Sequence, residues 1–327
     1  MSAGRKPRWD MAPFDADAAK LLVELDRNMP AAFHELGVEQ SRALLMFDSV
    51  PTGPSLEAVE EHQIDAAGDR VAVREYRPSS SSRGAILYLH GGGWAIGSLA
   101  SVDAACRHLA QRSGSRVFSV GYRQAPEHQY PVPLDDCWAA FEWLVSASDE
   151  IGVDRSQISI AGDSAGGNLA AGVALRATRT GGPAINSVVL VYPATELVND
   201  RASYREHTDA PLLTTKDVVW FWDLYLGSAT PDELAVPMLA TSLDGFPPTM
   251  ILTAEHDPIR DSSEAFAMSL ETAGVPVRLK RYDSVYHGFF ALTGLVAKAD
   301  QAVSDAAGFI SEQFRSTTAG SAQGGRS

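Results

Sequence analysis

The sequence contains few cysteines, which excludes a fold built on a disulfide framework. Cys106 and Cys137 are the only two among 327 residues, and both lie in segments with helical periodicity, so we expect buried free thiols. Long apolar runs are also missing. No stretch of roughly 18 apolar residues could span a membrane, and no apolar segment follows the charged first residues, as a secretory signal would require. These absences predict a cytoplasmic protein.

Basic residues are scarce compared with acidic ones. Lys and Arg number 27 against 41 Asp and Glu, which gives a formal net charge of −14. Nucleic acids and anionic membrane surfaces are bound by clustered Lys and Arg, so we expect neither as the main partner. The hydrophobic share of 45% is ordinary for a globular protein. At this length the chain can form one α/β domain with a substantial core, or two small domains.

From residue 85 onwards, short apolar runs alternate with helical stretches. The runs are AILYLH (85–90), RVFSVGY (116–122), QISIAG (157–162), SVVLVYP (187–193), TMILTAE (249–255) and VRLKRY (277–282). Runs that are apolar on both faces are typical of strands in a parallel sheet covered by helices on each side. The alternation predicts a doubly wound α/β fold. Before it, residues 60–78 alternate apolar and polar around Gly68, which predicts a hairpin of two edge strands.

Two regions lie outside this alternation. At the N-terminus, the periodicity of amphipathic helices covers residues 15–29 and 31–46. Later, the long interruption at 199–238 contains an aromatic-rich helix with Trp220, Phe221 and Trp222. This helix is either one more core helix or part of a cap over a site. We interpret the chain as N-terminal helices belonging to a cap (1–55), a catalytic domain (56–198 and 239–315), a cap insertion (199–238) and a disordered polar tail (316–327).

The segment AGDSAGGN (161–168) places Ser164 between glycines at a predicted strand-to-helix turn. Small neighbours are needed where a nucleophile sits on a strained, closely packed turn. The same serine could instead be a simple N-cap for the helix that follows. G-x-S-x-G by itself is a weak signal, and its weight comes from this context.

Three consecutive glycines, Gly91 to Gly93, directly follow the first predicted parallel strand in YLHGGGWAIGS (88–98). Backbone N–H groups in such a loop can point into a cavity and bind a carbonyl oxygen as it becomes an oxyanion. A flexible turn and a phosphate-binding loop are the alternatives, although no G-x-x-x-x-G-K-[ST] motif is present.

A serine hydroxyl needs a base within hydrogen-bond reach. Of the eight histidines, His287 follows the last predicted strand by a short loop, where a base would reach the carboxyl edge of the sheet. His256, after the preceding strand, is the rival candidate. Asp257 stands beside it and could orient the base, or it could cap the helix that begins near Pro258.

Other polar residues have plainer interpretations. Asp163 is expected to anchor the loop beside Ser164, and Glu127 to pair locally. Asp135 and Asp136 resemble a paired-carboxylate site but open a predicted helix, where acidic residues suit the helix dipole. No His, Cys or carboxylate group in the sequence has metal-ligand spacing, so we expect neither a metal nor a cofactor.

Five motifs in order resemble the hormone-sensitive-lipase-like esterases of the α/β-hydrolase superfamily, in the bacterial branch with the G-D-S-A-G form. They are HGGGW (90–94), YRQAPEHQYPVPLDDC (122–137), GDSAGGN (162–168), DPIRD (257–261) and YHGF (286–289). The resemblance spans about residues 65–314. It implies an α/β-hydrolase fold, with a mostly parallel central sheet, helices on both faces and a helical cap. The family order of serine, acid and histidine is kept.

The resemblance also implies roles for individual residues. Ser164 matches the nucleophile, His287 the general base and Asp257 the acid that orients it. The N–H groups of Gly92, Gly93 and Ala165 match the oxyanion hole, and His90 is expected to be structural. Candidate substrate-binding residues are Trp94, Asp163, Tyr192, Leu213 and Phe221.

The implied reaction is hydrolysis of short-chain acyl esters through an acyl-enzyme. The same machinery could serve a deacetylase or amidase acting on small acylated molecules, because the pocket selects the leaving group. A protein of this fold that binds a small ligand without turnover is a third possibility, which loss of a triad residue would indicate. The resemblance makes a homodimer plausible.

Overall fold

The computed structural model describes residues 9–44, 53–79 and 83–324, and its centre is one eight-stranded sheet. The strands lie in the order β1-β2-β4-β3-β5-β6-β7-β8. Their bounds are β1 Ala58–Ala66, β2 Asp69–Arg77, β3 Ala85–Leu89, β4 Arg116–Gly121, β5 Ile158–Asp163, β6 Val188–Val191, β7 Thr249–His256 and β8 Val277–Tyr286. All six predicted parallel strands and the predicted hairpin are therefore confirmed.

Strand direction divides the sheet into a hairpin and a parallel portion. β1 pairs with β2, and β2 with β4, in antiparallel register, whereas β3 to β8 pair in parallel. β1 alone forms the edge on this side, and β2 lies inside the sheet. Because the parallel strands all end at one edge, the loops that follow β3, β5, β7 and β8 are brought together there.

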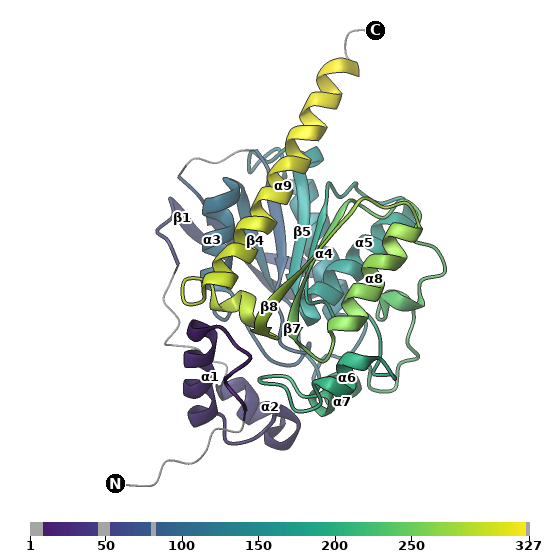
Figure 1. Cartoon of the computed structure of the whole chain (residues 1–327). Helices are drawn as coiled ribbons and strands as arrows, with labels where there is room; N and C mark the ends of the chain where they lie inside the picture. The colour runs from purple at the N-terminus through teal and green to yellow at the C-terminus, as the bar shows by residue number, and fades with distance from the viewer. Residues whose placement is uncertain (1–8, 45–52, 80–82, 325–327) are drawn as a thin grey trace.

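Helices cover both faces of the sheet (Figure 1). α3 and α9 pack on one face, and α4, α5 and α8 on the other. A further four helices, α1, α2, α6 and α7, lie together beyond one end of the sheet, and we call them the cap helices. The helices are α1 Ala16–Asn28, α2 Phe33–Leu44, α3 Asp103–Ser113, α4 Val132–Ala147, α5 Ala165–Thr180, α6 Ala202–Glu206, α7 Thr215–Leu226, α8 Arg260–Thr272 and α9 Ala297–Gly324; η1 Arg155–Gln157, η2 Pro237–Leu239 and η3 Phe289–Leu292 are 3-10 turns.

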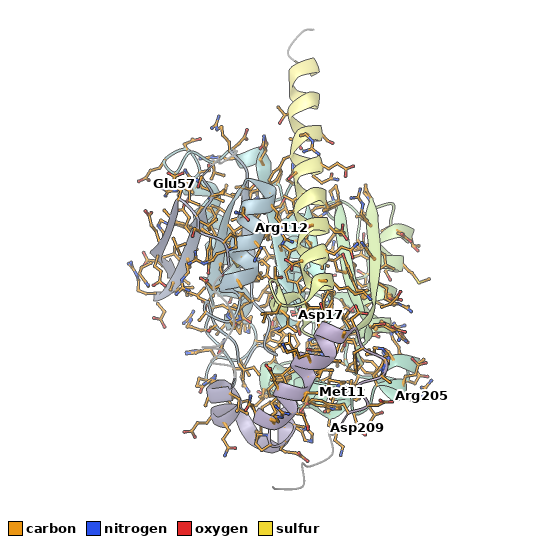
Figure 2. All side chains as sticks on the ribbon, turned by 60° about the vertical axis from the view of Figure 1, so that its left-hand side comes forward. Met11, Asp17, Glu57, Arg112, Arg205 and Asp209 are labelled. Atoms are coloured by element: carbon orange, nitrogen blue, oxygen red, sulfur yellow. The ribbon has the colours of Figure 1, made fainter. Side chains whose placement is uncertain are left out.

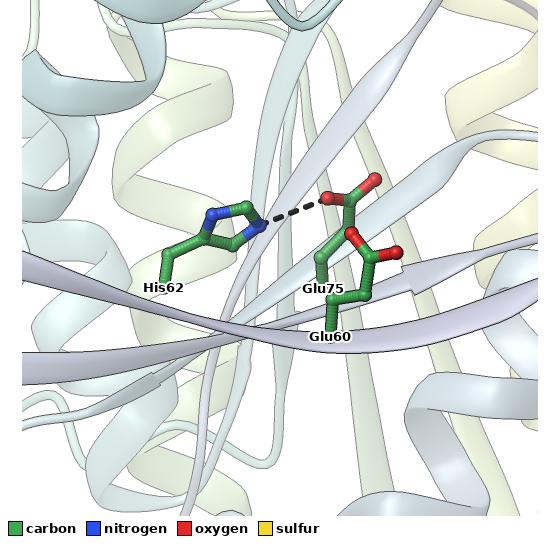
Figure 3. Close-up of side chains that lie close together, drawn as sticks. All are labelled: Glu60, His62 and Glu75. Carbon is green, nitrogen blue, oxygen red and sulfur yellow. Dashed lines mark hydrogen bonds and ion pairs between the residues drawn. The ribbon is translucent and has the colours of Figure 1, made fainter.

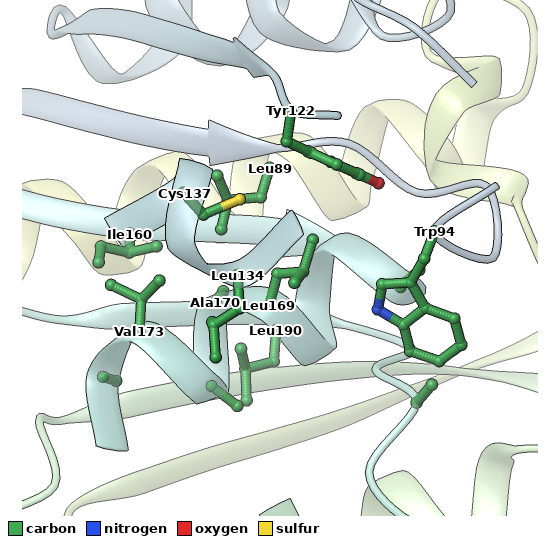
Figure 4. Close-up of a cluster of buried hydrophobic side chains, with 14 of the residues drawn as sticks. Leu89, Trp94, Tyr122, Leu134, Cys137, Ile160, Leu169, Ala170, Val173 and Leu190 are labelled. Atoms are coloured by element: carbon green, nitrogen blue, oxygen red, sulfur yellow. The ribbon is translucent and has the colours of Figure 1, made fainter. Parts of the chain in front are cut away.

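The core between the sheet and α4 and α5 combines aliphatic with aromatic side chains and the thiol of Cys137, and it has little polar content (Figure 4). Leu89, Ile160 and Leu190 project from three neighbouring strands, and all are fully buried. Leu134 of α4 and Leu169 of α5 meet them from the helical layer. Burial on both faces explains why these strands are near-continuous apolar runs in the sequence.

The N-terminal helix is joined to the body of the fold by polar contacts with the start of α9 (Figure 2). The carboxylate of Asp17 accepts a hydrogen bond of 2.7 Å from the N–H of Ala297, and Lys298 forms an ion pair of 2.9 Å with Asp15. These contacts hold α1 over the edge of the sheet at which the parallel strands end.

The C-terminal segment differs from its prediction. Residues 316–324 continue α9 as a helix, whereas the sequence predicted a disordered tail from 316 to 327; residues 325–327 lie outside the described part. Side-chain anchors explain the difference, because Asn186 donates to the hydroxyl of Thr317 and Gln157 to that of Thr318. Among the described residues, no helix is long and apolar enough to cross a membrane.

Two other features can be compared with the sequence. Cys106 and Cys137 are buried free thiols, as predicted. The second predicted N-terminal helix is present as α2, with a break at Gly37, whose φ of +76° is left-handed. The last predicted residues of that helix, 45 and 46, lie outside the described part of the chain.

Candidate active site

Ser164 lies in a tight turn between β5 and α5. Its φ of +54° is strained for a residue with a side chain, and its N–H donates to the carbonyl of Val191 at 2.8 Å. The flanking glycines are required by close backbone approach. A Cβ on Gly162 would lie 2.3 Å from the carbonyl oxygen of Gly166, and one on Gly166 would lie 1.9 Å from that of Leu89. The small residues of the motif are thus explained.

Three side chains from separate loops form a continuous hydrogen-bonded chain. The Oγ of Ser164 lies 2.8 Å from Nε2 of His287, and Nδ1 of His287 lies 2.7 Å from Oδ2 of Asp257. Asp257 is fully buried, and its other oxygen accepts from the N–H of Ile259 at 2.9 Å. This second bond fixes the carboxylate, so the imidazole has one preferred orientation with Nε2 toward the serine.

The alternative interpretations of these residues can be decided on geometry. Ser164 occupies the N-cap position of α5, but its side chain makes no capping hydrogen bond. His256, the rival base, packs its ring against Phe14 and His207, and it is not among the residues that line the cavity around Ser164. The structure therefore brings His287, and not His256, to the serine.

Gly92, Gly93 and Ala165 line the cavity beside Ser164. Gly92 and Gly93 have φ values of +117° and +56°, a backbone conformation that glycine adopts more readily than other residues. Ala165 is the first residue of α5, where N–H groups have no partner within the helix and the helix dipole favours negative charge. Among the described residues, no hydrogen bond uses the N–H of any of these three.

The glycine loop is fixed from below by Asp163, as predicted. One oxygen of this carboxylate accepts from the hydroxyl of Tyr88 at 2.9 Å and from the N–H of Gly91 at 3.0 Å. Burial raises the pKa of Asp163, and these hydrogen bonds oppose the rise. His90 is buried, donates to the carbonyl of Gly91 through Nδ1, and stacks on Tyr122. Burial lowers the pKa of His90 to about 4, so this ring is neutral at pH 7.

A cavity of about 530 Å³ opens above the serine. Its floor is formed by the glycine loop, Ser164 and His287, and its walls by three of the cap helices (α1, α2 and α7) and the segments that follow β6 and β8. All of the predicted substrate-binding residues line it: Trp94, Asp163, Tyr192, Leu213 and Phe221. Ligand sites are commonly mostly apolar cavities of this size with few polar groups.

The N-terminal helix contributes a wall that the sequence did not identify residue by residue. Leu21 and Leu25 of α1 line the cavity, together with Glu24, Asn28 and Met29, the residue that follows the helix. Leu21 and Leu25, spaced by four, lie on one face of the helix. Their spacing was visible in the sequence, but it also fits a helix that packs against a core.

Asn168 is a second residue that sequence reasoning missed. Its Oδ1 accepts from the indole N–H of Trp94 at 3.2 Å, and its Nδ2 donates to the carbonyls of Ala194 and Ala235. It therefore joins the glycine loop to the segment leading to the cap helices. A buried polar residue one turn after the serine was the available signal, because such a residue must find partners.

Three acidic residues outside the cavity pair with arginines. Asp136 pairs with Arg123 and Asp135 with Arg176, each with a shortest distance of 2.6 Å, so the two carboxylates serve separate ion pairs at the start of α4. The prediction that Glu127 pairs locally is wrong. Its partner lies on α2, 85 residues earlier in the chain.

Glu60, His62 and Glu75 come together on the β1–β2 hairpin (Figure 3). Their possible ligand atoms lie within 4.8 Å of one another, a grouping hidden in the sequence because antiparallel pairing creates it. The carboxylate of Glu75 lies 2.9 Å from His62, 3.1 Å from Arg77 and 3.6 Å from Arg116, all within ion-pair distance. Hydrogen bonds to Arg77 and His62 lower the pKa of this carboxyl against the effect of burial. The cluster is thus an ion-pair network on the hairpin.

The fold agrees with comparisons to known proteins. A family model described as the α/β-hydrolase fold matches residues 86–291. The chain therefore belongs to the α/β-hydrolase family, in the hormone-sensitive-lipase-like group that its motifs resemble.

Its relatives include named esterases. The esterase LipI of Mycobacterium tuberculosis is 37% identical over 77% of this chain and 81% of that protein. The ethyl acetate hydrolase of Pseudomonas putida is 36% identical over 72% of this chain and 76% of that protein. Among solved structures, a hyperthermophilic esterase from the archaeon Pyrobaculum calidifontis superimposes with a TM-score of 0.85 at 34% identity, covering 92% of this chain and 98% of that one.

Proposed function

We propose that the protein is a serine carboxylesterase in which Ser164 is the nucleophile, His287 the general base and Asp257 the acid that orients it. The observation that carries this proposal is the unbroken chain from Asp257 through His287 to the serine oxygen, at 2.7 and 2.8 Å. It ends at the floor of a cavity. A nucleophile, a base and an orienting group within hydrogen-bond reach are what acyl transfer requires.

The reaction follows from the positions of these atoms. Ser164 Oγ attacks the ester carbonyl while Nε2 of His287 takes its proton, and the imidazolium that results is stabilised by Asp257. The N–H groups of Gly92, Gly93 and Ala165 bind the oxyanion of the tetrahedral intermediate. His287 then donates the proton to the leaving alcohol. In the second half, His287 activates a water molecule that releases the acid from Ser164.

The cavity supports a small, neutral ester as the substrate. Its acidic and basic side chains are Glu24, Asp163 and His287, and neither Lys nor Arg occurs among the described lining residues. Leu25, Phe221 and other apolar groups form most of the wall, which favours short aliphatic or aryl acyl groups. We propose further that the cap helices form the substrate-binding cover, while residues 56–198 and 239–315 perform the chemistry.

The cytoplasmic location and the homodimer stay predictions from the sequence. Two buried free thiols suit a reducing compartment, in which disulfides rarely form.

The experiment is hydrolysis of p-nitrophenyl esters from C2 to C16 by the wild type and Ser164→Ala, side by side. A rate that peaks at short chains and falls at least about 10⁴-fold in the variant is expected. Retained activity in a variant with native circular dichroism would remove Ser164 from the mechanism. Silence of the wild type across the series, followed by turnover of p-nitroacetanilide, would indicate an amidase. Silence with both, but saturable ligand binding, would indicate a non-catalytic protein.

A further inference from the structure

Arg42, on the cap helix α2, bonds directly to the loop that carries the glycines. Its Nε donates to the carbonyl of Ala95 at 2.8 Å, and its Nη2 to the carbonyl of Ala125 at 3.0 Å. Nη1 and Nη2 also bind the two oxygens of Glu127, each at 2.8 Å. The planar guanidinium thus uses four N–H groups on three partners, a fork geometry that a lysine cannot reproduce.

The carbonyls of Ala95 and Ala125 belong to two segments that are also hydrogen-bonded to each other. The N–H of Ala125 donates to the carbonyl of Trp94 at 2.9 Å, which joins the segment after β4 to the end of the glycine loop. The guanidinium of Arg42 bridges both sides of this pairing. The bidentate pair with Glu127 fixes the guanidinium in turn, and the hydrogen bond from Arg42 lowers the pKa of this carboxyl to about 2.

Ala95 is connected to the proposed oxyanion donors by a short, closed turn. The N–H groups of Ala95 and Ile96 both donate to the carbonyl of Gly92, at 3.1 and 2.8 Å. The Gly92 carbonyl and the Gly93 N–H belong to the same peptide unit. The orientation of that N–H therefore depends on where the turn holds Ala95, whose carbonyl Arg42 holds.

The helix that carries Arg42 is also anchored at its other end. The N–H and the Nδ1 atom of His34 both contact one oxygen of Asp217 on α7, at 2.8 and 2.7 Å. α7 places Phe221 so close to Gly93 that a Cβ there would lie 2.1 Å from the ring. α2 is thereby fixed both to the glycine loop and to the helix that covers it.

We propose that Arg42 is a positioning residue for the oxyanion hole, which couples the seating of α2 to the orientation of the Gly92 and Gly93 amides. This inference rests on the proposed function. It predicts that loss of Arg42 weakens stabilisation of the transition state more than binding of the ground state.

The chain offers a closely matched control. Arg179, on α5, also makes a bidentate pair with a glutamate, Glu233, and donates to a backbone carbonyl, that of Ser242. Its side chain is 32% exposed, against 35% for Arg42, and none of these partners lies in the glycine loop. Arg179→Ala removes a similar set of contacts, with one backbone carbonyl fewer, and does not touch the proposed oxyanion hole.

The experiment compares wild type, Arg42→Ala, Arg42→Lys and Arg179→Ala with a short p-nitrophenyl ester and two inhibitors. An alkyl trifluoromethyl ketone adds the Ser164 hydroxyl, so that an Oγ–C bond forms, the serine proton moves to His287 and the carbonyl oxygen becomes an oxyanion in the hole. The corresponding methyl ketone binds without this addition. Thermal unfolding of each variant reports its stability.

We expect Arg42→Ala to lower kcat about 10- to 100-fold with KM nearly unchanged, because misplaced catalytic groups lose rates of this order. Its affinity for the trifluoromethyl ketone should fall by a similar factor, whereas methyl ketone binding should change less than about twofold. Arg42→Lys should recover only part of the rate, and Arg179→Ala should match the wild type in all three assays.

Equal effects of Arg42→Ala and Arg179→Ala, or an equal loss of both ketones, would overturn the proposal. If Arg42→Ala fails to fold, the comparison of Arg42→Gln with Arg179→Gln decides the same question. An inactive wild type would contradict the proposed function itself, a result distinct from an active wild type whose rate does not depend on Arg42.

Discussion

The sheet side and the cap side of the cavity are built in different ways. The sheet side, which includes the cavity floor and which we call the sheet wall, consists of short loops after β3, β5, β7 and β8. Backbone geometry holds the proposed catalytic groups of this wall in place. Gly92, Gly93 and Ser164 all have positive φ. The cap wall consists of aliphatic and aromatic side chains such as Leu25 of α1 and Phe221 of α7. We expect the first wall to determine which reaction is possible and the second to determine which substrates reach it.

The walls meet in an aromatic cluster. The indole of Trp94, which ends the glycine loop, stacks on Tyr225 of α7 with a centroid distance of 4.4 Å and an interplanar angle of 5°. Trp222 packs against the same indole at 4.4 Å. Contacts of this kind stabilise by about 0.5–1.5 kcal/mol each beyond the area they bury. Substitutions where the two walls touch can therefore test how far one wall depends on the other.

After the loss of Ser164 itself, the largest effect is expected where the two walls touch, at Gly93. In Gly93→Ala the new Cβ would lie 2.1 Å from the Phe221 ring, at a φ of +56° that alanine tolerates poorly. The amide must shift, so kcat for a short ester should fall about 10²–10³-fold. Steady-state kinetics with p-nitrophenyl butyrate measures this.

Two variants separate the causes. Adding Phe221→Ala relieves the clash but leaves the strained φ, so the double variant should recover about tenfold in kcat. Gly152→Ala places alanine at a φ of +72° in open space, so it should cost about 1 kcal/mol of stability with kcat unchanged. A double variant no faster than Gly93→Ala would show that Phe221 is not the obstacle.

The sheet wall should also lose stability on acidification through His90. Burial lowers the pKa of this side chain from its ordinary value of 6.5 to about 4. The unfolded chain therefore binds a proton as pH falls through 6.5, while the folded protein does not until about pH 4. The stability that the neutral ring contributes is present above pH 6.5 and is lost as pH falls. The loss is about 2 kcal/mol at pH 5.

Urea unfolding at pH 8 and pH 5 tests this expectation. His90→Asn keeps a side-chain N–H that can bond to Gly91 but does not titrate, so its loss of stability between the two pH values should be about 2 kcal/mol smaller than in the wild type. Equal losses in the two proteins would exclude His90 as a source of acid sensitivity.

The smallest effect is expected on the cap wall, where substitutions should change selectivity and leave the reaction intact. Leu25→Trp enlarges a partly buried side chain that lines the cavity, so longer acyl chains should fit less well. The ratio of kcat/KM for C8 to that for C2 p-nitrophenyl esters should fall about tenfold, with the C2 value almost unchanged. Val219→Trp, at an exposed position of the same cap, should leave the ratio as it is. An equal loss for both esters would mean that α1 also affects the sheet wall.

The difference between the sheet wall and the cap wall explains which features could be predicted from the sequence. The strands, the serine turn and the order of Ser164, Asp257 and His287 follow from local patterns, because buried parallel strands and tight turns restrict residue types over short windows. The glycines beside Ser164 are required because a Cβ at Gly162 or Gly166 would lie only about 2 Å from a backbone carbonyl oxygen, and this requirement allows few alternatives.

Long-range pairings were less accessible. Arg42 and Glu127 are 85 residues apart, and nothing in either local sequence specifies the other as its partner. Leu21 and Leu25 have a helical period that a core-packed helix would share. The helical end of α9 was misjudged because its small polar residues suggested disorder, whereas the hydrogen bonds that anchor Thr317 and Thr318 come from distant segments.

The length and direction of α9 have a practical consequence. The cap helices and the far end of α9 lie at opposite ends of the molecule (Figure 1), so the last turns of this helix project away from the cavity. Attachment of the enzyme to a solid support through its C-terminal end would therefore leave the cavity facing the solution. A support attached beside α1 would instead lie next to residues that line the cavity.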